Sequence, residues 1–128
     1  MSSVVLDASA LIALVNKEPG GEKVRPVMSS AIMGAVNFCE TIQRLRRGGM
    51  PLEAVTAALT PLVTDPVPFD SASAYIAASI YEQTRAAGLS FGDCACLALA
   101  LSRNLPAMTA ERDAWDKVDV GVKIIKIR

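Results

Sequence analysis

Short apolar runs alternate with longer amphipathic segments along the whole chain. Runs of β-branched and other apolar residues predict strands, and apolar residues three or four positions apart predict helices. The predicted strands are residues 3–6, 67–69, 107–109 and 122–127, with a short extended piece at 27–29. Because strands and helices alternate, we expect an α/β fold in which helices cover both faces of a parallel sheet.

Glycine, proline and aspartate mark the ends of the predicted helices. Asp7 precedes the first helix, Gly48 and Gly88 follow two others, and Pro51 stands in a first turn, where proline is favoured. The predicted helices are residues 7–15, 31–47, 51–63, 70–87 and 93–103, with shorter helical pieces at 22–25 and 114–117. No repeat or linker interrupts the 128 residues, so we expect one domain, 1–128.

Charge and cysteine content limit the class of protein. The formal net charge is zero, so any binding of nucleic acid must rest on local basic patches. The start of the chain has no basic signal-peptide region, and its longest apolar stretch is too short and too polar to span a bilayer. With three cysteines and no secretory signal, we expect a reduced, cytoplasmic protein.

The sequence contains no histidine. This excludes Ser-His-Asp and Cys-His catalysis, and it excludes ribonuclease chemistry that uses paired histidines. Glycine-rich motifs that bind nucleotide phosphates are also missing. If the protein is an enzyme, carboxylates are therefore its natural catalytic groups.

Two acidic residues stand at predicted helix starts and are expected to face inward. Asp7 directly follows the first strand, at the edge of a parallel sheet where reactive groups gather. Asp93 begins the helix 93–103, with apolar Leu97 and Ala100 flanking its direction. Capping of a helix N-terminus is an alternative role for each of them.

Glu40 is predicted to lie on an apolar arc of the helix 31–47, together with Val36 and Cys39. A carboxylate in such a setting is costly unless it is paired or bound to a metal. An ion pair with Arg44, one turn later, is the alternative. Crowded carboxylates repel one another, and a divalent cation relieves that repulsion. Mg²⁺ or Mn²⁺ prefers such oxygen ligands and can support hydrolysis of a phosphodiester without histidine.

Four segments of the chain together resemble the PIN-domain nucleases, and among them the VapC toxins. The segments are VVLDASALIAL, SAIMGAVNFCETIQRL, LSFGDCACLALALSRNLPAMTAERDAW and VKIIKIR, and the resemblance covers essentially the whole length. It implies a PIN-like three-layer α/β/α fold with a central parallel sheet and an acidic pocket that binds Mg²⁺ or Mn²⁺.

The resemblance also implies roles for particular residues. Asp7, Glu40 and Asp93 match the three principal acids of the family and are the implied metal ligands. Ser9 matches a supporting polar position, and Thr109 matches the threonine that begins the fourth motif.

The fourth acid of the family usually lies two residues after that threonine, which is the position of Glu111. The spacing then departs from the family pattern, because Trp115 lies one place further on than in many relatives. Glu111 is therefore the predicted fourth ligand, with Asp113 as an alternative and Asp116 as a weaker one.

The implied activity is that of a metal-dependent endoribonuclease, the toxin of a type II toxin–antitoxin system that cleaves RNA such as tRNA or ribosomal RNA. The implied partners are a VapB-type antitoxin and a second copy of the chain. Two alternatives stay open. One is an inactive relative that binds RNA or protein. The other is a metal-dependent phosphatase, although Ser9 stands where a nucleophilic-aspartate phosphatase normally has a second acid.

Two further groups of residues have simpler interpretations. Arg44, Arg46 and Arg47 form a basic cluster that is either solvated at a helix end or in contact with a phosphate. Cys94 and Cys96 have no second cysteine pair with which to hold a metal, so core packing is expected.

Overall fold

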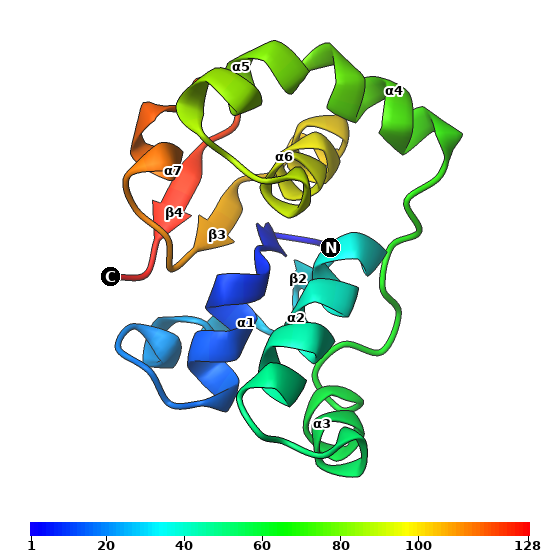
Figure 1. Ribbon diagram of the computed structural model, residues 1–128, viewed down its shortest axis with the longest axis vertical. Helices are drawn as coiled ribbons and strands as arrows, with labels where there is room; N and C mark the ends of the chain where they lie inside the picture. The colour runs from blue at the N-terminus through cyan, green and yellow to red at the C-terminus, as the bar shows by residue number, and fades with distance from the viewer.

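A computed structural model describes all residues, 1–128, as a three-layer α/β/α arrangement (Figure 1). The central sheet is entirely parallel and has the strand order β2-β1-β3-β4. Its strands are short: β1 is Val4–Leu6, β2 is Ala31–Ile32, β3 is Ala107–Thr109 and β4 is Ile124–Lys126. The predicted fold class is therefore confirmed.

The alternation of side chains along the strands creates two separate cores. In β1, Val4 and Leu6 belong to one buried cluster, whereas Val5 belongs to the other. In β3, Met108 joins the cluster of Val4 and Leu6, and Ala107 joins that of Val5. Because successive residues of a strand point to opposite faces, both faces of the sheet are covered by apolar side chains.

The helices divide between these two faces. One layer contains α1 (Ala8–Val15), α2 (Ala35–Arg47) and α3 (Leu52–Leu59), with the short 3₁₀ helices η1 (Gly21–Lys23) and η2 (Arg25–Val27) beside α1. The other layer contains α4 (Ser71–Ser79), α5 (Tyr81–Ala87), α6 (Phe91–Arg103) and α7 (Ala114–Lys117). None of these helices is both long enough and apolar enough to cross a membrane.

The segment between α1 and α2 differs most from its prediction. Residues 27–29 are not extended, because η2 and a turn occupy them. Residues 31–32, predicted as the start of a helix, form the edge strand β2 instead. The helix begins only at Ala35, with the extended Gly34 as its N-cap. Pairing with β1 thus overrides the helical pattern of these residues.

Three other boundaries also differ. The predicted helix 70–87 is two helices, because the buried Ile80 interrupts it and lets α4 pack on α6 while α5 reaches α7. Residues 67–69 form a single bridge, from Val67 to Gly34, rather than a strand. The helix predicted for 51–63 ends at Leu59. The predicted pieces 107–109 and 114–117 match β3 and α7.

The two central strands bring distant residues together at one edge of the sheet. Leu6 of β1 lies opposite Met108 of β3 in the ladder. Asp7 follows Leu6 and Thr109 follows Met108, so these two polar residues meet where the neighbouring strands end. Parallel strands always place their carboxyl ends at the same edge, and that edge carries the candidate site.

Gly20 allows the loop after α1 to close on the C-terminal end of the sheet. Its φ is +89°, and a Cβ atom there would lie 2.4 Å from the carbonyl oxygen of Ile127.

We predict that Gly20→Ala lowers the free energy of unfolding by more than about 2 kcal/mol, because it combines backbone strain with a backbone clash. Gly49→Ala is the matched control: its φ is +108°, nothing lies within 4 Å, and strain alone costs about 1 kcal/mol. Denaturant unfolding of both variants checks this, and equal losses would contradict it.

Candidate active site

Asp7 lies where β1 passes into α1. Its backbone N–H donates to the carbonyl of Met108 at 2.9 Å, and its own carbonyl accepts from the N–H of Ala10 at 3.1 Å. The side chain is almost completely buried, with 2% exposed. Although Asp7 occupies the N-cap position of α1, its carboxylate makes no capping hydrogen bond. The capping alternative is therefore wrong for this residue.

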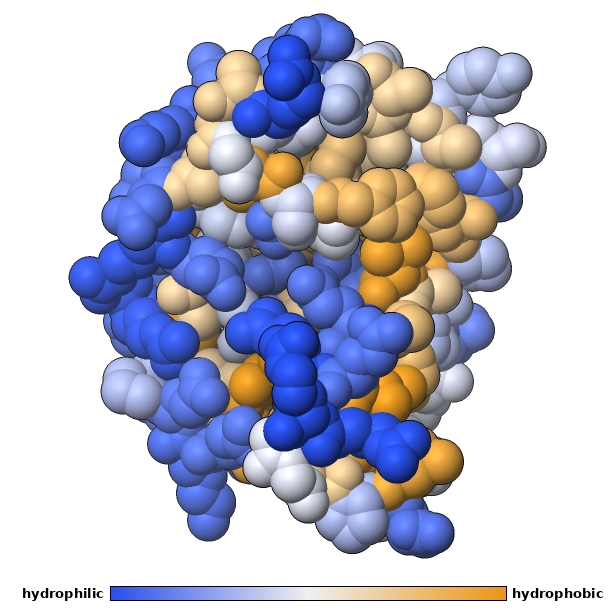
Figure 2. Space-filling view, in the orientation of Figure 1, coloured by the Kyte–Doolittle hydropathy of each residue, from blue (hydrophilic) through white to orange (hydrophobic).

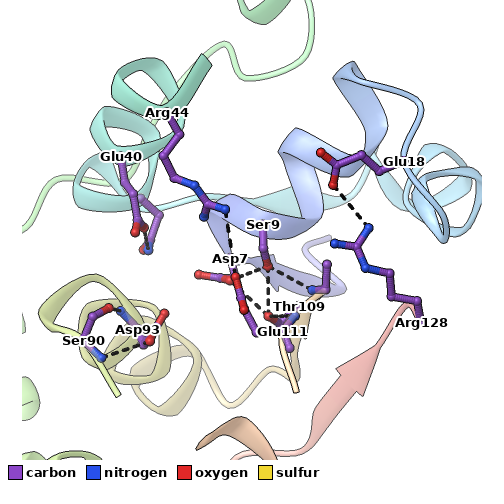
Figure 3. A network of polar contacts seen from close by, with 12 residues as sticks. Asp7, Ser9, Glu18, Glu40, Arg44, Ser90, Asp93, Thr109, Glu111 and Arg128 are labelled. Carbon is purple, nitrogen blue, oxygen red and sulfur yellow. Dashed lines mark hydrogen bonds and ion pairs between the residues drawn. The ribbon is translucent and has the colours of Figure 1, made fainter. Parts of the chain in front are cut away.

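Two hydroxyl groups hold the Asp7 carboxylate instead. Oδ2 of Asp7 lies 2.6 Å from Ser9 Oγ and 3.0 Å from Thr109 Oγ1, and both hydroxyls can donate to it. Ser9 Oγ accepts the N–H of Ala110 at 2.9 Å, and Thr109 Oγ1 accepts the N–H of Glu111 at 3.0 Å. These backbone donors occupy the acceptor side of each hydroxyl, which leaves its proton free to turn toward the carboxylate. Oδ1 of Asp7 accepts no hydrogen bond from the protein, so it is the oxygen that remains available (Figure 3).

The surroundings of Asp7 favour its protonated form. Burial raises the pKa of its carboxyl from 3.8 to about 6, against the opposing effect of the hydrogen bond from Ser9. The negative charges of Asp93 and Glu40 raise this pKa further. A cation beside Asp7 would reverse both effects, since it stabilises the ionised carboxylate.

Glu40 reaches the same region from α2, and two neighbours define its position. Asn37, of which 1% is exposed, donates from Nδ2 to the carbonyl of Gly92 at 2.9 Å and to Glu40 Oε1 at a longer 3.5 Å. A Cβ atom on Gly92 would lie only 2.8 Å from Glu40 Oε1. The absence of a side chain at Gly92 thus lets Glu40 lie against the start of α6. Burial raises the pKa of the Glu40 carboxyl, and the charge of Asp93 adds to this.

The predicted arc of Val36, Cys39 and Glu40 lies on one face of α2 and lines a partly apolar recess. It is not buried core, because Cys39 is exposed. The buried face of the helix consists of Asn37, Thr41 and Leu45. Sequence reasoning missed Asn37 and Gly92. The available signals were a polar residue one turn before Glu40 and a glycine directly before Asp93.

Asp93 combines a helix-capping role with a place in the site. It is the third residue of α6, and Ser90, not Asp93, is the N-cap. Asp93 Oδ2 accepts the N–H of Ser90 at 3.0 Å, and Ser90 Oγ accepts the N–H of Asp93 at 3.2 Å, which completes a capping box. This arrangement fixes the carboxylate through one oxygen, while Oδ1 accepts no hydrogen bond from the protein (Figure 3).

Only some of the candidates for the fourth acid lie near the others. Glu111 and Asp113 both line the recess that contains Glu40 and Asp93. Asp116 does not line it, because its carboxylate pairs with Lys126 Nζ at 2.5 Å on β4. The structure therefore separates Asp116 from the other acids and leaves Glu111 and Asp113 as candidates.

Glu40, Asp93, Glu111 and Asp113 line one recess of about 320 Å³ at the carboxyl edge of the sheet, whereas the buried Asp7 is not among its lining residues. Figure 3 shows Glu40 from α2, Asp93 from α6 and Asp7 from the end of β1 around a common space, and Figure 2 shows polar residues over the middle of this face. Cys96 is fully buried in the core on the α6 side of the sheet. Burial raises the pKa of its thiol, and the charges of Asp7, Asp93 and Glu40 raise it further.

The carboxylate oxygens of these residues do not form a complete coordination shell around one position. No three acidic or cysteine side chains lie close enough to form a ready cluster around one ion. Mg²⁺ typically takes one or two protein carboxylates and keeps several waters. The Oδ1 atoms of Asp7 and Asp93, which accept no hydrogen bond from the protein, are oxygen ligands of the kind that a hydrated ion takes. The donor set therefore fits Mg²⁺ or Mn²⁺ and gives no support for structural zinc.

The sequence matches the PIN domain family over residues 4–121. The chain belongs to the PIN domain family. Members of this family are nucleases. No curated protein matches the chain by sequence.

Solved structures with the same fold extend this result. The chain is similar to DNA-bound VapBC from Salmonella typhimurium, with a TM-score of 0.79 and 17% identity over 100% of both chains. It is similar to FitAcB from Neisseria gonorrhoeae, with a TM-score of 0.72 and 19% identity over 97% of each chain. It is also similar to VapBC-5 from Mycobacterium tuberculosis, with a TM-score of 0.63 and 23% identity over 98% of this chain and 99% of that one. At these identities the likeness shows that the PIN fold is shared.

The buried Asp7 carboxyl should make stability depend on pH in the metal-free protein. Its pKa is higher in the folded state, so its contribution is fully present below 3.8 and is lost as the pH rises to about 6. The loss amounts to about 3 kcal/mol. In EDTA, we therefore expect Asp7→Asn to be more stable than the wild type at neutral pH, with the difference vanishing near pH 4. Denaturant unfolding across this pH range measures the difference, and a constant gap between the two proteins would refute it.

Proposed function

We propose that this PIN domain protein is a metal-dependent endoribonuclease and the toxin component of a type II toxin–antitoxin system. The observation that carries the proposal is the Asp7 carboxylate, buried and held through Oδ2 by Ser9 and Thr109 while Oδ1 stays free. Glu40 and Asp93 act electrostatically on the same group. A buried acid surrounded by further acids is a costly arrangement that a functional cation would relieve.

Within this proposal, Asp7 and Asp93 would hold Mg²⁺ or Mn²⁺, and Glu40 and Glu111 would complete the acidic ring. A divalent ion bound there would lower the pKa of a coordinated water and neutralise charge on the phosphate. The raised pKa of the Glu40 carboxyl suits it to accept a proton from the attacking water. Ser9 and Thr109 would keep Asp7 in one orientation throughout the reaction.

The proposed substrate is RNA, with tRNA and ribosomal RNA as the first candidates, cleaved by phosphodiester hydrolysis in the cytoplasm. The proposed neutralising partner is a VapB-type antitoxin. In its support, the VapBC and FitAcB proteins share the fold over nearly the whole of this chain. A short neighbouring reading frame that encodes a small DNA-binding protein is the genomic arrangement that this proposal requires.

The decisive experiment compares cut RNA ends after induction of the wild type and of Asp7→Asn. We expect the variant to lose growth inhibition and at least about 100-fold of the cleavage rate, because removing a metal ligand forfeits several kcal/mol of charge stabilisation. Asp116→Asn is the matched control, since its carboxylate pairs with Lys126 outside the recess, and it should cleave like the wild type. Undiminished cleavage by purified Asp7→Asn would disprove the mechanism, and turnover of a small phosphate ester in place of RNA would favour a phosphatase.

We also propose a homodimer that covers an exposed apolar surface beside the site. Phe91 is 64% exposed and Tyr81 is 51% exposed. Both line an entirely apolar recess of about 320 Å³, together with Phe69, whose ring meets that of Phe91 edge-on with the centroids 5.7 Å apart. Figure 2 shows a group of hydrophobic residues, in orange, beside the hydrophilic centre of this face. Contiguous apolar surface of this kind is typical of protein–protein contacts.

Phe91→Glu should therefore weaken self-association by at least about 100-fold, because it places an unpaired charge in the contact. Leu52→Glu is the control: Leu52 is 48% exposed but lies on α3, on the other layer. Light scattering across a concentration series gives the mass of each variant. A wild-type monomer, or equal weakening by the two substitutions, would count against this surface.

A further inference from the structure

Arg44 differs from the other arginines of α2 in where its side chain points. It lies four residues after Glu40, so both are on the same face of the helix. It lines the acidic recess, with 35% of its side chain exposed. Arg46 and Arg47 are exposed and do not line that recess. Figure 3 shows the guanidinium of Arg44 extending from α2 toward Asp7 and Glu111.

The guanidinium of Arg44 has no hydrogen bond within the protein. Its closest acidic contact joins Nη2 to Glu111 Oε1 at 4.0 Å, which is beyond hydrogen-bonding distance. Arg112, the other arginine of the recess, already donates from Nε to the carbonyl of Arg128 at 3.0 Å. The N–H groups of the Arg44 guanidinium are therefore free to donate hydrogen bonds in the recess. The nearby carboxylates hold the side chain there by electrostatic attraction.

The recess is lined by several acidic side chains, so an anionic substrate needs a positively charged group there to bind. Glu40, Asp93, Glu111 and Asp113 line it, and the buried Asp7 interacts electrostatically with Glu40 and Asp93. These carboxylates repel a phosphodiester, and the repulsion is strongest where water is partly excluded. A guanidinium matches two phosphate oxygens in one plane and keeps its charge at all relevant pH values.

We infer that Arg44 binds a phosphate of the RNA strand at the recess and is a substrate-binding residue of the proposed nuclease. This inference rests on the proposed function and extends it to a residue outside the acidic set. The rival explanation is that Arg44 only balances the charge of Glu40 and Glu111. Charge balance affects the acids, whereas phosphate binding affects the affinity for RNA and its dependence on salt.

The test measures binding without cleavage, in proteins that carry Asp7→Asn. The probe is a short fluorescein-labelled single-stranded RNA of random sequence, followed by anisotropy in Mg²⁺ between about 50 and 200 mM salt. We expect Arg44→Gln to raise the Kd about 10-fold and to lower the slope of log Kd against log salt by roughly 0.7, the value for one phosphate contact on a single strand. Arg47→Gln is the control on the same helix, and its slope should stay unchanged.

Arg44→Lys separates charge from geometry and decides the question if Arg44→Gln does not fold. It keeps the positive charge but lacks the planar fork. We expect it to retain the salt slope while cleavage, measured with Asp7 restored, falls at least about 10-fold. Cleavage by Arg44→Lys at the wild-type rate would overturn the role of the fork.

Two further outcomes would overturn the inference while leaving the nuclease intact. One is an unchanged Kd and salt slope for Arg44→Gln. The other is an equal effect of Arg47→Gln, which would show diffuse attraction rather than a site. The proposed function fails differently, because the wild type would then cleave no RNA. Mn²⁺ titration followed by the fluorescence of Trp115, the single tryptophan, is performed on each Arg44 and Arg47 variant with Asp7 restored and verifies that the variant keeps its recess.

Discussion

The pairing of β1 with β3 is the constraint on which the site depends. It places Asp7 beside Thr109, more than a hundred residues away in sequence, at the ends of adjacent parallel strands. Ser9 then closes the triangle from the first turn of α1, and the backbone after β3 fixes both hydroxyls. The Asp7 carboxyl is buried here with two hydroxyl partners, one on β3 and one in the first turn of α1, so that it does not lack hydrogen bonds. Any change that disrupts the pairing of β1 with β3 would therefore also disrupt the hydrogen bonds of Asp7.

The remaining acids are held by local devices that also stabilise the helices. Asp93 belongs to the capping box of α6, so its position follows from the start of that helix. Glu40 depends on contact between α2 and α6, where Asn37 spans the two helices and Gly92 leaves the space. Asp7 and Asp93 each have one carboxylate oxygen held by hydrogen bonds within the protein, and Glu40 lies against the start of α6. Glu40 and Asp93 also line the recess, and the raised pKa values of Asp7 and Glu40 show the electrostatic cost of bringing these acids together.

The sequence predicted the parts of this structure that local rules govern. The run before Asp7 and the segment ending at Thr109 gave strands at the right positions, since buried β-branched and apolar runs have few alternatives. The sequence could not distinguish β2 from the start of α2, because a strand of two residues is too short to show an alternating pattern of apolar and polar side chains. Glu40 was selected through an apolar arc that is not the buried face of α2. Asn37 and Gly92 act only across an interface between helices, which no single stretch of sequence describes.

The net charge of zero hides a strong local separation of charge, and this separation bears on what the recess can accept. Acids gather at the carboxyl edge of the sheet, where a cation is favoured and a nucleic acid is repelled. A divalent ion offsets only part of that repulsion, because several carboxylates share it. Arg44 adds positive charge from the same helix that supplies Glu40, so in the proposed mechanism one helix would contribute both a group for the metal region and a group for the phosphate. Glu40 and Arg44 lie one turn apart, so α2 carries both the candidate for proton transfer and the candidate for phosphate binding.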